Sequence, residues 1–260
     1  MSYKRKWTIA TVNFMSTDYI RWQAKMLHEF NDDFIFIILD NSYPKLQVDE
    51  LEEIKKEYTN TVVIYNAPPN SLETVKGGSG SHGKGLTHIL NNSKSKYFLS
   101  NDPDFFWVIK GHLRYLEKYL DQGFHAVGAQ NLGALTFPNI WGSAYITEEI
   151  RGCNLQAKSS FCSHCNQYVY DTRYDTGWEL FIRLKHLPYK YFRETEPTVP
   201  FLGPHSYDFK PMTYADGDTP VGHHLMRGAY YDNDFLTPKM QIARNNYGKY
   251  FYDLMNSQQK

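Results

Sequence analysis

The chain has 260 residues and a formal net charge of zero, so it lacks the basic excess that is typical of nucleic-acid-binding proteins. This length suits one large domain or two small ones. The longest purely apolar run, Phe34–Leu39, is too short to cross a bilayer, and no apolar signal segment follows the charged start. Three cysteines, an odd number, favour a reducing compartment. We therefore expect a cytoplasmic protein with no integral membrane segment.

The first 104 residues alternate between short apolar runs and amphipathic segments. We expect the first helix at about Thr17–Phe30 with Ser16 as its cap, and a glycine-rich loop, Gly77–Gly85, before the third helix. The expected strands are Trp7–Val12, Phe34–Leu39, Thr61–Tyr65 and Tyr97–Ser100, and the other helices are Leu46–Tyr58 and Leu86–Asn92. This alternation predicts an α/β fold, with a parallel sheet and right-handed crossovers.

The second half is less regular. The expected helices are Lys110–Leu120 and Thr176–His186, and the expected strands are His125–Ala129, Ser143–Thr147 and Tyr189–Arg193. From Thr195 onward Pro, Gly and Asp are frequent, which predicts loops, and a terminal helix is expected within Leu236–Met255.

Two carboxylates follow the expected strand Tyr97–Ser100. Asp102 and Asp104 flank Pro103, which prevents the strand from continuing. They therefore lie beyond the carboxyl end of a strand, where open α/β sheets bind ligands. Carboxylate oxygens suit Mg²⁺ or Mn²⁺, and such an ion suits a diphosphate. The alternative is a solvated turn. The chain holds two more Asp-x-Asp triplets, but only this one follows a strand-like run, which favours a metal site here.

Asp40 and Lys84 are candidates for binding a nucleotide. Asp40 closes the second expected strand, where it either accepts hydrogen bonds from a base or ribose or forms an Asx turn. Lys84 lies in a segment that nearly matches a phosphate loop, but Gly85 stands where a Ser or Thr hydroxyl is required. This mismatch excludes an ATPase of that type. Two interpretations remain, a helix start that faces a phosphate and a surface loop.

The segment before the expected helix Thr176–His186 contains further acidic residues. Asp175 is either a helix cap or a general base, and Glu179 lies one turn further along. Trp178 offers a ring for stacking on an acceptor, although packing is the more common use of such a residue.

Cysteine and histidine residues in the second half raise the question of a metal. Cys153, Cys162 and Cys165 include one pair with zinc-ligand spacing, but no fourth ligand is evident, so free thiols are the favoured interpretation over structural zinc. His223 and His224 lie in an expected late loop, where they either complete the coordination of a catalytic metal or are an exposed or core-capping pair.

The order of these features resembles that of glycosyltransferases of the GT-A fold, most of all the family 2 type, over roughly residues 7 to 193. The resemblance implies a mostly parallel central sheet flanked by helices, with an irregular C-terminal acceptor region. It implies that Thr11 and Asn13 line the nucleotide and that Asp40 contacts the base. It also implies that Lys84 lies near the donor, and that Asp102 and Asp104 hold a divalent ion and the sugar diphosphate.

The resemblance also implies a catalytic base at the start of a late helix. The family's usual pattern is Glu-Asp before an aromatic residue, whereas this chain has Thr176–Leu180 with Asp175 just upstream, so the base is Asp175 or Glu179, with Asp175 preferred. Trp178 then faces the acceptor. A late histidine on the metal is common in GT-A enzymes, and His223 or His224 is the candidate here.

The implied activity is metal-dependent transfer of a sugar, with inversion, from a nucleotide-diphosphate donor to a glycan or other hydroxyl acceptor. The implied division is a single catalytic domain, 1–215, with a nucleotide-sugar half (1–105) and an acceptor half (106–215), followed by a loop and helix extension (216–260). The chain then has no nucleic-acid partner but can associate peripherally with a membrane that holds a lipid-linked acceptor. Two alternatives are a nucleotidyltransferase, disfavoured because no glycine-rich loop with Arg follows the first strand, and a non-catalytic, zinc-stapled sugar-binding module.

Overall fold

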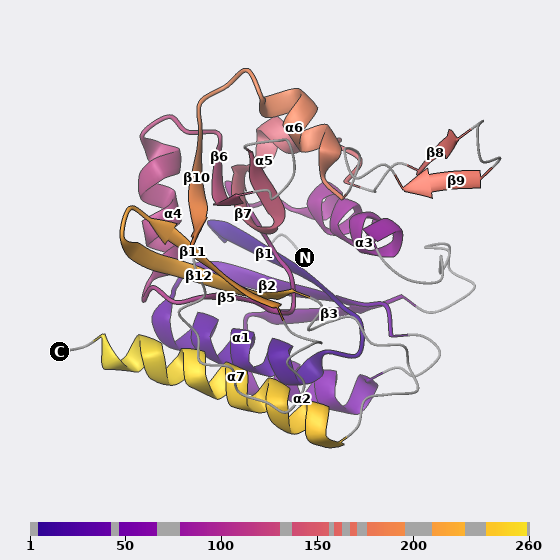
Figure 1. The fold of residues 1–260 in the computed structure, drawn as a ribbon. Helices are drawn as coiled ribbons and strands as arrows, with labels where there is room; N and C mark the ends of the chain where they lie inside the picture. The colour runs from indigo at the N-terminus through magenta and orange to yellow at the C-terminus, as the bar shows by residue number, and fades with distance from the viewer. Residues whose placement is uncertain are drawn as a thin grey trace.

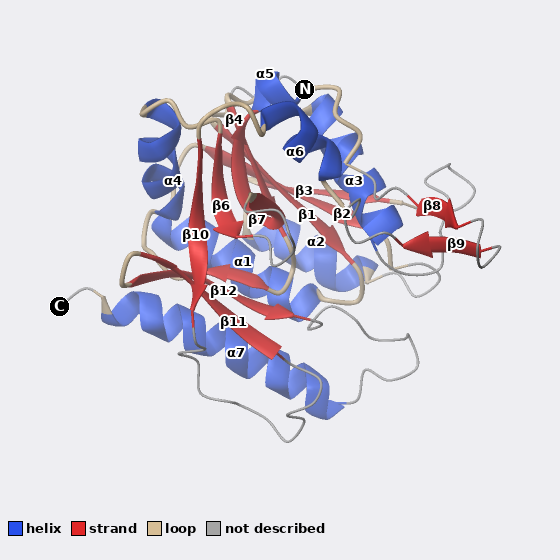
Figure 2. Ribbon diagram, turned by 45° about the horizontal axis from the view of Figure 1, so that its top comes forward, coloured by secondary structure: helices blue, strands red, loops and turns tan. Residues whose placement is uncertain are grey.

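A mixed sheet forms the centre of the molecule in the computed structural model (Figures 1 and 2). The structure describes residues 5–42, 47–66, 79–130, 137–155, 159–162, 167–170, 176–195, 210–226 and 238–258. Within them the sheet has ten strands in the order β3-β2-β1-β4-β7-β6-β10-β11-β12-β5. These are β1 (Trp7–Asn13), β2 (Phe34–Asp40), β3 (Thr61–Tyr65), β4 (Tyr97–Asn101), β5 (Phe105–Trp107), β6 (Ala126–Gln130), β7 (Pro138–Ile146), β10 (Tyr189–Thr195), β11 (Lys210–Asp216) and β12 (Thr219–Met226). A separate hairpin consists of β8 (Ser159–Cys162) and β9 (Gln167–Tyr170).

Helices cover both faces of the sheet. The helices are α1 (Thr17–Phe30), α2 (Val48–Glu57), α3 (Ser79–Asn92), α4 (His112–Asp121), α5 (Thr147–Ile150), α6 (Trp178–Leu184) and α7 (Pro238–Ser257). Apolar side chains of α1, α2 and α4 belong to one buried cluster, and those of α3, α5 and α6 belong to another on the opposite face. This two-sided cover explains why the central strands are apolar on both faces instead of alternating.

The strand and helix alternation predicted for the first half is confirmed. Strand β1 pairs in parallel with β2 and β4, and β2 pairs in parallel with β3. Beyond β4 the sheet becomes mixed, since β7 is antiparallel to both of its neighbours and only β6 and β10 form a further parallel pair. Among the described strands, a continuous run of parallel pairs is therefore formed by the first half of the chain alone.

Two local predictions in the first half need correction. Ser16 is the N-cap residue of α1 by position, as expected, but its side chain makes no capping hydrogen bond, because its hydroxyl donates to the Phe14 carbonyl oxygen at 2.9 Å. The glycine-rich segment is not a loop up to Gly85, because α3 already begins at Ser79. A Cβ atom on Gly85 would lie 2.9 Å from Val12 Cγ2, so the glycine allows α3 to pack closely on β1. This packing outweighs the low helix propensity of glycine.

The region expected to be loops after Thr195 contains two strands. β11 and β12 pair as an antiparallel hairpin, and β12 pairs in turn with β5. The domain boundary expected after residue 215 therefore falls inside this hairpin. The expected terminal helix is present as α7, which lies alongside α1 (Figure 1). None of the described helices has the length and apolar character needed to cross a membrane.

Candidate functional site

The turn between β4 and β5 carries Asp102 and Asp104. The Asp102 backbone N–H donates to the Trp141 carbonyl oxygen of β7 at 2.7 Å, and the Phe105 N–H donates to the Asp102 carbonyl oxygen at 3.0 Å. The first bond keeps the chain attached to the sheet as β4 ends. The second closes a tight turn, after which β5 leaves β4 and pairs with β12 at the far end of the sheet order.

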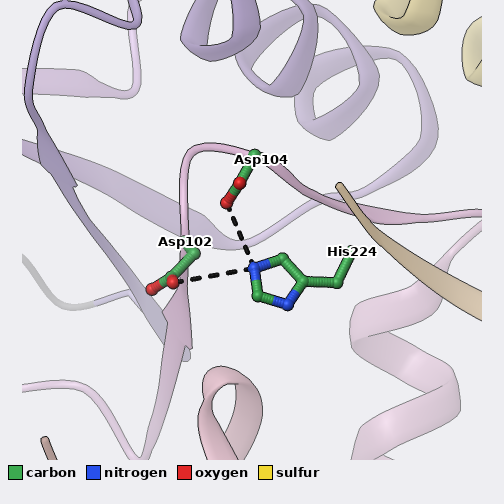
Figure 3. A group of neighbouring side chains, drawn as sticks. All are labelled: Asp102, Asp104 and His224. Atoms are coloured by element: carbon green, nitrogen blue, oxygen red, sulfur yellow. Dashed lines mark hydrogen bonds and ion pairs between the residues drawn. The ribbon is translucent and has the colours of Figure 1, made fainter. Parts of the chain in front are cut away.

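The pairing of β5 with β12 brings His224 to this turn. His224 is the register partner of Phe105, and the Leu225 N–H donates to the Asp104 carbonyl oxygen at 3.0 Å. His224 Nε2 lies 3.2 Å from Asp104 Oδ1 and 3.9 Å from Asp102 Oδ2 (Figure 3). The imidazole also stacks on Trp141, with ring centroids 5.2 Å apart. Its orientation is thus fixed from two sides.

The charges of this group stabilise one another. Burial alone would lower the pKa of His224, but the neighbouring carboxylates of Asp104 and then Asp102 outweigh it and raise the pKa. Burial alone would raise the pKa of Asp102, but the charge and hydrogen bond of His82, followed by the charge of His224, hold it below its ordinary value. The group therefore favours the ionised form of Asp102 and the protonated form of His224 more than isolated side chains would.

These three side chains have the geometry of a metal-binding group. One ligand atom from each of Asp102, Asp104 and His224 lies within 4.8 Å of the other two. Asp104 and His224 are buried, whereas the side chain of Asp102 is 22% exposed, so the group opens to solvent on one side. Carboxylate oxygens suit Mg²⁺ and Mn²⁺, and an imidazole nitrogen favours a transition metal, so the donor set fits a divalent ion such as Mn²⁺.

His82 is a residue of this site that the sequence interpretation missed. It lies in the second turn of α3, and its Nε2 atom is 3.1 Å from Asp102 Oδ1. Asp102 therefore lies between an imidazole from α3 and another from β12. In a helix, His82 and the buried Leu86 are four residues apart and therefore lie on the same face. This spacing indicates that His82 faces the sheet, but only when the glycine-rich segment is predicted as helix.

Asp40 and Asn13 lie together at the carboxyl ends of neighbouring strands. They are register partners of β2 and β1, and Asp40 Oδ1 accepts hydrogen bonds from Asn13 Nδ2 at 2.8 Å and from Ser42 Oγ at 2.6 Å. Burial raises the pKa of Asp40, and the bonds from Ser42 and then Asn13 act in the opposite direction. Thr11 is buried in β1, and Lys84 is half-buried inside α3 rather than in a loop.

Of the two candidate catalytic residues, Glu179 lies in the first turn of α6. Glu179 Oε2 accepts the Asn154 backbone N–H at 2.7 Å, and Trp178 is half-buried in the same first turn. Gly177 precedes the helix with φ +85°, a conformation that favours glycine. Asp175 lies outside the described residues.

Of the remaining candidates, His223 and Cys153 are not part of the group of three. His223 points to the other face of β12, where its Nδ1 atom is 3.0 Å from Thr213 Oγ1 and its ring stacks on Phe251. Cys153 is buried in the core cluster on the face covered by α3, and burial raises the pKa of its thiol. Cys165 and the side chain of Cys162 lie outside the described part of the chain.

Comparisons with known proteins identify the fold. No protein-family model and no curated protein sequence matches the chain. Among solved structures, the mannosyltransferase PcManGT of Pyrobaculum calidifontis, in complex with GDP-Man and Mn²⁺, matches 80% of this chain and 60% of its own, with a TM-score of 0.52 and 11% identity. The glycosyltransferase GlyE of Streptococcus pneumoniae matches 98% of this chain and 63% of its own, with a TM-score of 0.50 and 13% identity.

The chain has the GT-A fold. At these identities the likeness concerns the fold, and the chain spans less than two thirds of the length of either structure. The expected α/β architecture with helices on both faces of a central sheet is confirmed. In this fold Asp102 and Asp104 lie at the carboxyl end of the parallel half of the sheet, beside the polar ends of β1 and β2.

Proposed function

We propose that the chain is a glycosyltransferase that moves a sugar from a nucleotide-diphosphate donor to an acceptor hydroxyl with the help of a divalent metal ion. The observation that carries this proposal is the group formed by Asp102, Asp104 and His224 at the edge of a GT-A sheet. The structural similarity to a mannosyltransferase solved with GDP-Man and Mn²⁺ supports both a nucleotide-sugar donor and a divalent ion.

Asp102, Asp104 and His224 would hold the ion. When bound there, it would supply positive charge that offsets the charge developing on the departing nucleoside diphosphate. His82 Nε2 lies 3.1 Å from Asp102 Oδ1, so it would orient this ligand without contacting the ion itself. The half-exposed Lys84, two residues further along α3, is the candidate for a direct contact with the diphosphate.

The ends of β1 and β2 form the proposed base and ribose subsite. The Asp40 carboxylate already accepts hydrogen bonds from Asn13 and Ser42, so its role is to fix these polar groups as a unit. Thr11 and Asn13 line the same strand end.

We assign the proton-accepting role to Asp175 and not to Glu179. One carboxylate oxygen of Glu179 is occupied by the Asn154 backbone N–H, a bond that anchors the start of α6 to the preceding segment. Asp175, just before that helix, would remove the proton of the acceptor hydroxyl, and the oxygen would then attack the anomeric carbon on the face opposite to the leaving diphosphate. Attack from that face would invert the configuration of the anomeric carbon. Trp178 is the proposed acceptor-facing ring.

The binding step is tested by titrating a panel of nucleoside diphosphates into the protein with and without Mn²⁺. Wild type is expected to bind at least one of them more than tenfold tighter with Mn²⁺, and Asp104→Asn is expected to remove this gain. Asp218→Asn is the matched control, since Asp218 belongs to another Asp-x-Asp triplet and lies exposed in the β11–β12 turn. Equal Mn²⁺-dependent affinities for wild type and Asp104→Asn would refute the metal assignment.

The chemical step is tested separately with Asp175→Asn. This variant is expected to retain Mn²⁺-dependent donor binding and to lose sugar transfer by at least a thousandfold, because it removes the proton acceptor but leaves the metal ligands intact. Near-normal turnover by Asp175→Asn would exclude Asp175 as the base.

A further inference from the structure

Three carbonyl oxygens of the turn between β4 and β5 converge on one buried amide. Gln23 Nε2, from the middle of α1, lies 2.7 Å from the Asp102 carbonyl oxygen, 2.9 Å from that of Pro103 and 2.9 Å from that of Phe105. Gln23 is only 5% exposed. Since an amide NH₂ group has two hydrogens, three acceptors share two donors, and the nitrogen is fully used by this turn.

The fourth carbonyl of the turn, that of Asp104, accepts a hydrogen bond from the other side. Its donor is the Leu225 backbone N–H of β12 at 3.0 Å. The turn is therefore held between α1 on one side and the strand that carries His224 on the other.

We propose that Gln23 is a positioning residue that holds this turn in the conformation in which Asp102 and Asp104 can bind one ion together with His224. This inference rests on the proposed metal-dependent function. Gln23 acts through the backbone of the turn, because its side-chain nitrogen contacts carbonyl oxygens and not the carboxylates.

The proposed positioning of the turn by Gln23 depends on its hydrogen bond to the Pro103 carbonyl oxygen. Asn101 Nδ2 also donates to the Asp102 and Phe105 carbonyl oxygens, at 3.2 Å and 3.1 Å, so these two retain a donor without Gln23. For the Pro103 carbonyl, Gln23 supplies the only hydrogen bond identified among the described residues. This carbonyl belongs to the peptide between Pro103 and Asp104. Rotation of that peptide changes the direction in which the Asp104 side chain leaves the backbone.

The position of Gln23 in α1 supports a specific role. It lies on the buried face of the helix between Ile20 and Leu27, where an apolar residue would be the ordinary choice. Burying an amide is unfavourable unless its hydrogen bonds are satisfied. The bonds to the turn satisfy its nitrogen, whereas no hydrogen-bond partner of its Oε1 atom is identified among the described residues, so the contacts with the turn are what favours a glutamine at this position.

The experiment compares wild type with Gln23→Met, which has a similar length but no donor, and with Ile20→Val as a matched control. Ile20 is fully buried on the same helix. Each protein is titrated with Mn²⁺, and amide hydrogen exchange is measured by NMR at Phe105 and Leu225, whose N–H groups bond within and across the turn. Both measurements are made well below the melting temperature of each variant.

Gln23→Met is expected to bind Mn²⁺ about tenfold more weakly, because an unpaired buried carbonyl destabilises the native turn. Exchange at Phe105 and Leu225 is expected to become about tenfold faster relative to the strand amides of β1. Ile20→Val should change neither the Mn²⁺ affinity nor this ratio. Wild-type Mn²⁺ affinity in Gln23→Met, or unchanged exchange at both amides, would overturn the inference.

The same experiment separates this inference from the proposed function. If wild type itself binds no Mn²⁺ or Mg²⁺, the metal-dependent function is wrong, and so is a metal-positioning role for Gln23. If wild type binds Mn²⁺ and Asp104→Asn does not, but Gln23→Met binds as wild type does, the function stands and only the role of Gln23 is wrong.

Discussion

Two regions of the molecule contribute to the candidate metal-binding group in different ways. One is the set of parallel strands β3, β2, β1 and β4, and the other is the β11–β12 hairpin, against which α7 packs. The parallel strands bring together residues whose positions follow from local order, because each strand ends at the same edge and its polar end residues meet there. The hairpin reaches that edge through the pairing of β12 with β5. His224 and Asp104 are 120 residues apart in sequence, yet their side chains lie 3.2 Å apart.

The two faces of β12 show how one strand contributes both to core packing and to the candidate metal-binding group. His223 is 1% exposed and packs toward α7, and burial lowers its pKa to about 4. For His224, on the opposite face, the nearby carboxylates overcome burial and raise the pKa. Neighbouring histidines thus occupy opposite electrostatic environments because successive strand residues point to opposite sides.

The largest effect is expected from breaking the contact between α7 and the hairpin. Phe251 is fully buried, and its ring stacks on Phe106 of β5 and on His223 of β12, with centroid distances of 4.9 Å and 5.0 Å. Phe251→Ala should lower the free energy of unfolding by about 4 kcal/mol, as expected for removing a buried aromatic ring. Chemical denaturation monitored by circular dichroism measures this loss.

Lys249→Ala is the control for Phe251→Ala, since Lys249 is exposed on the same helix. The control should change the free energy of unfolding by less than about 0.5 kcal/mol. If Phe251→Ala proves as mild as the control, α7 does not support the hairpin, and the proposed contrast between the two regions fails.

Two glycine-to-alanine substitutions, one in each region, test the two regions separately and should change the free energy of unfolding less than Phe251→Ala does. A Cβ atom on Gly222 of β12 would lie 2.7 Å from Cζ of the buried Phe105 ring, whereas one on Gly85 of α3 would lie 2.9 Å from Val12 Cγ2. Gly222→Ala should destabilise the protein by about 2 kcal/mol through overpacking. Gly85→Ala should cost less, because alanine regains about 1 kcal/mol of helix propensity.

Mn²⁺ affinity distinguishes these two alanine variants. Gly222→Ala pushes β12 away from β5 and should weaken Mn²⁺ binding severalfold, since His224 lies two residues further along the same strand. Gly85→Ala should leave Mn²⁺ binding close to that of wild type. Equal effects of the two substitutions on Mn²⁺ affinity would mean that the position of β12 does not set the geometry of the group.

Sequence reasoning was most accurate where structure depends on local pattern. The helix Thr17–Phe30 was predicted with the bounds that the structure gives, and the strand before Asp102 was placed within one residue of β4. The helix follows from its apolar periodicity, and the strand follows from an apolar run that ends before Pro103. The placement of Asp102 and Asp104 beyond the end of that strand follows from the same local signals.

The hairpin could not be predicted in this way. Pro211, Pro220 and Gly222 lie within β11 and β12, and prolines and glycines in such number indicate loops. The structure explains the glycine, since Gly222 allows close approach of the Phe105 ring. Nor could the sequence choose between His223 and His224, because that choice depends on the register with β5.

The smallest effect is expected at the junction of the two regions, and it depends on pH. His112 at the start of α4 stacks on Trp107 of β5, and its Nδ1 atom lies 3.4 Å from Asn31 Nδ2 at the end of α1. Burial lowers the pKa of His112 to about 3, only partly offset by a backbone hydrogen bond at Ile109. The native state therefore keeps this imidazole neutral at pH values at which the unfolded chain binds a proton.

A folded-state pKa below the unfolded value of about 6.5 means that stability falls as the pH decreases from about 6.5 toward 3. At pH 5.5 this single group should lower the free energy of unfolding by about 1 kcal/mol relative to pH 8. His112→Phe keeps a ring against Trp107 but removes the titrating group. Between pH 8 and pH 5.5 its free energy of unfolding should therefore decrease less than that of wild type, and the difference should equal the contribution of His112. Urea denaturation of both proteins at pH 8 and 5.5 measures the difference. Parallel losses in the two proteins would show that His112 does not remain neutral in the junction between α1 and β5.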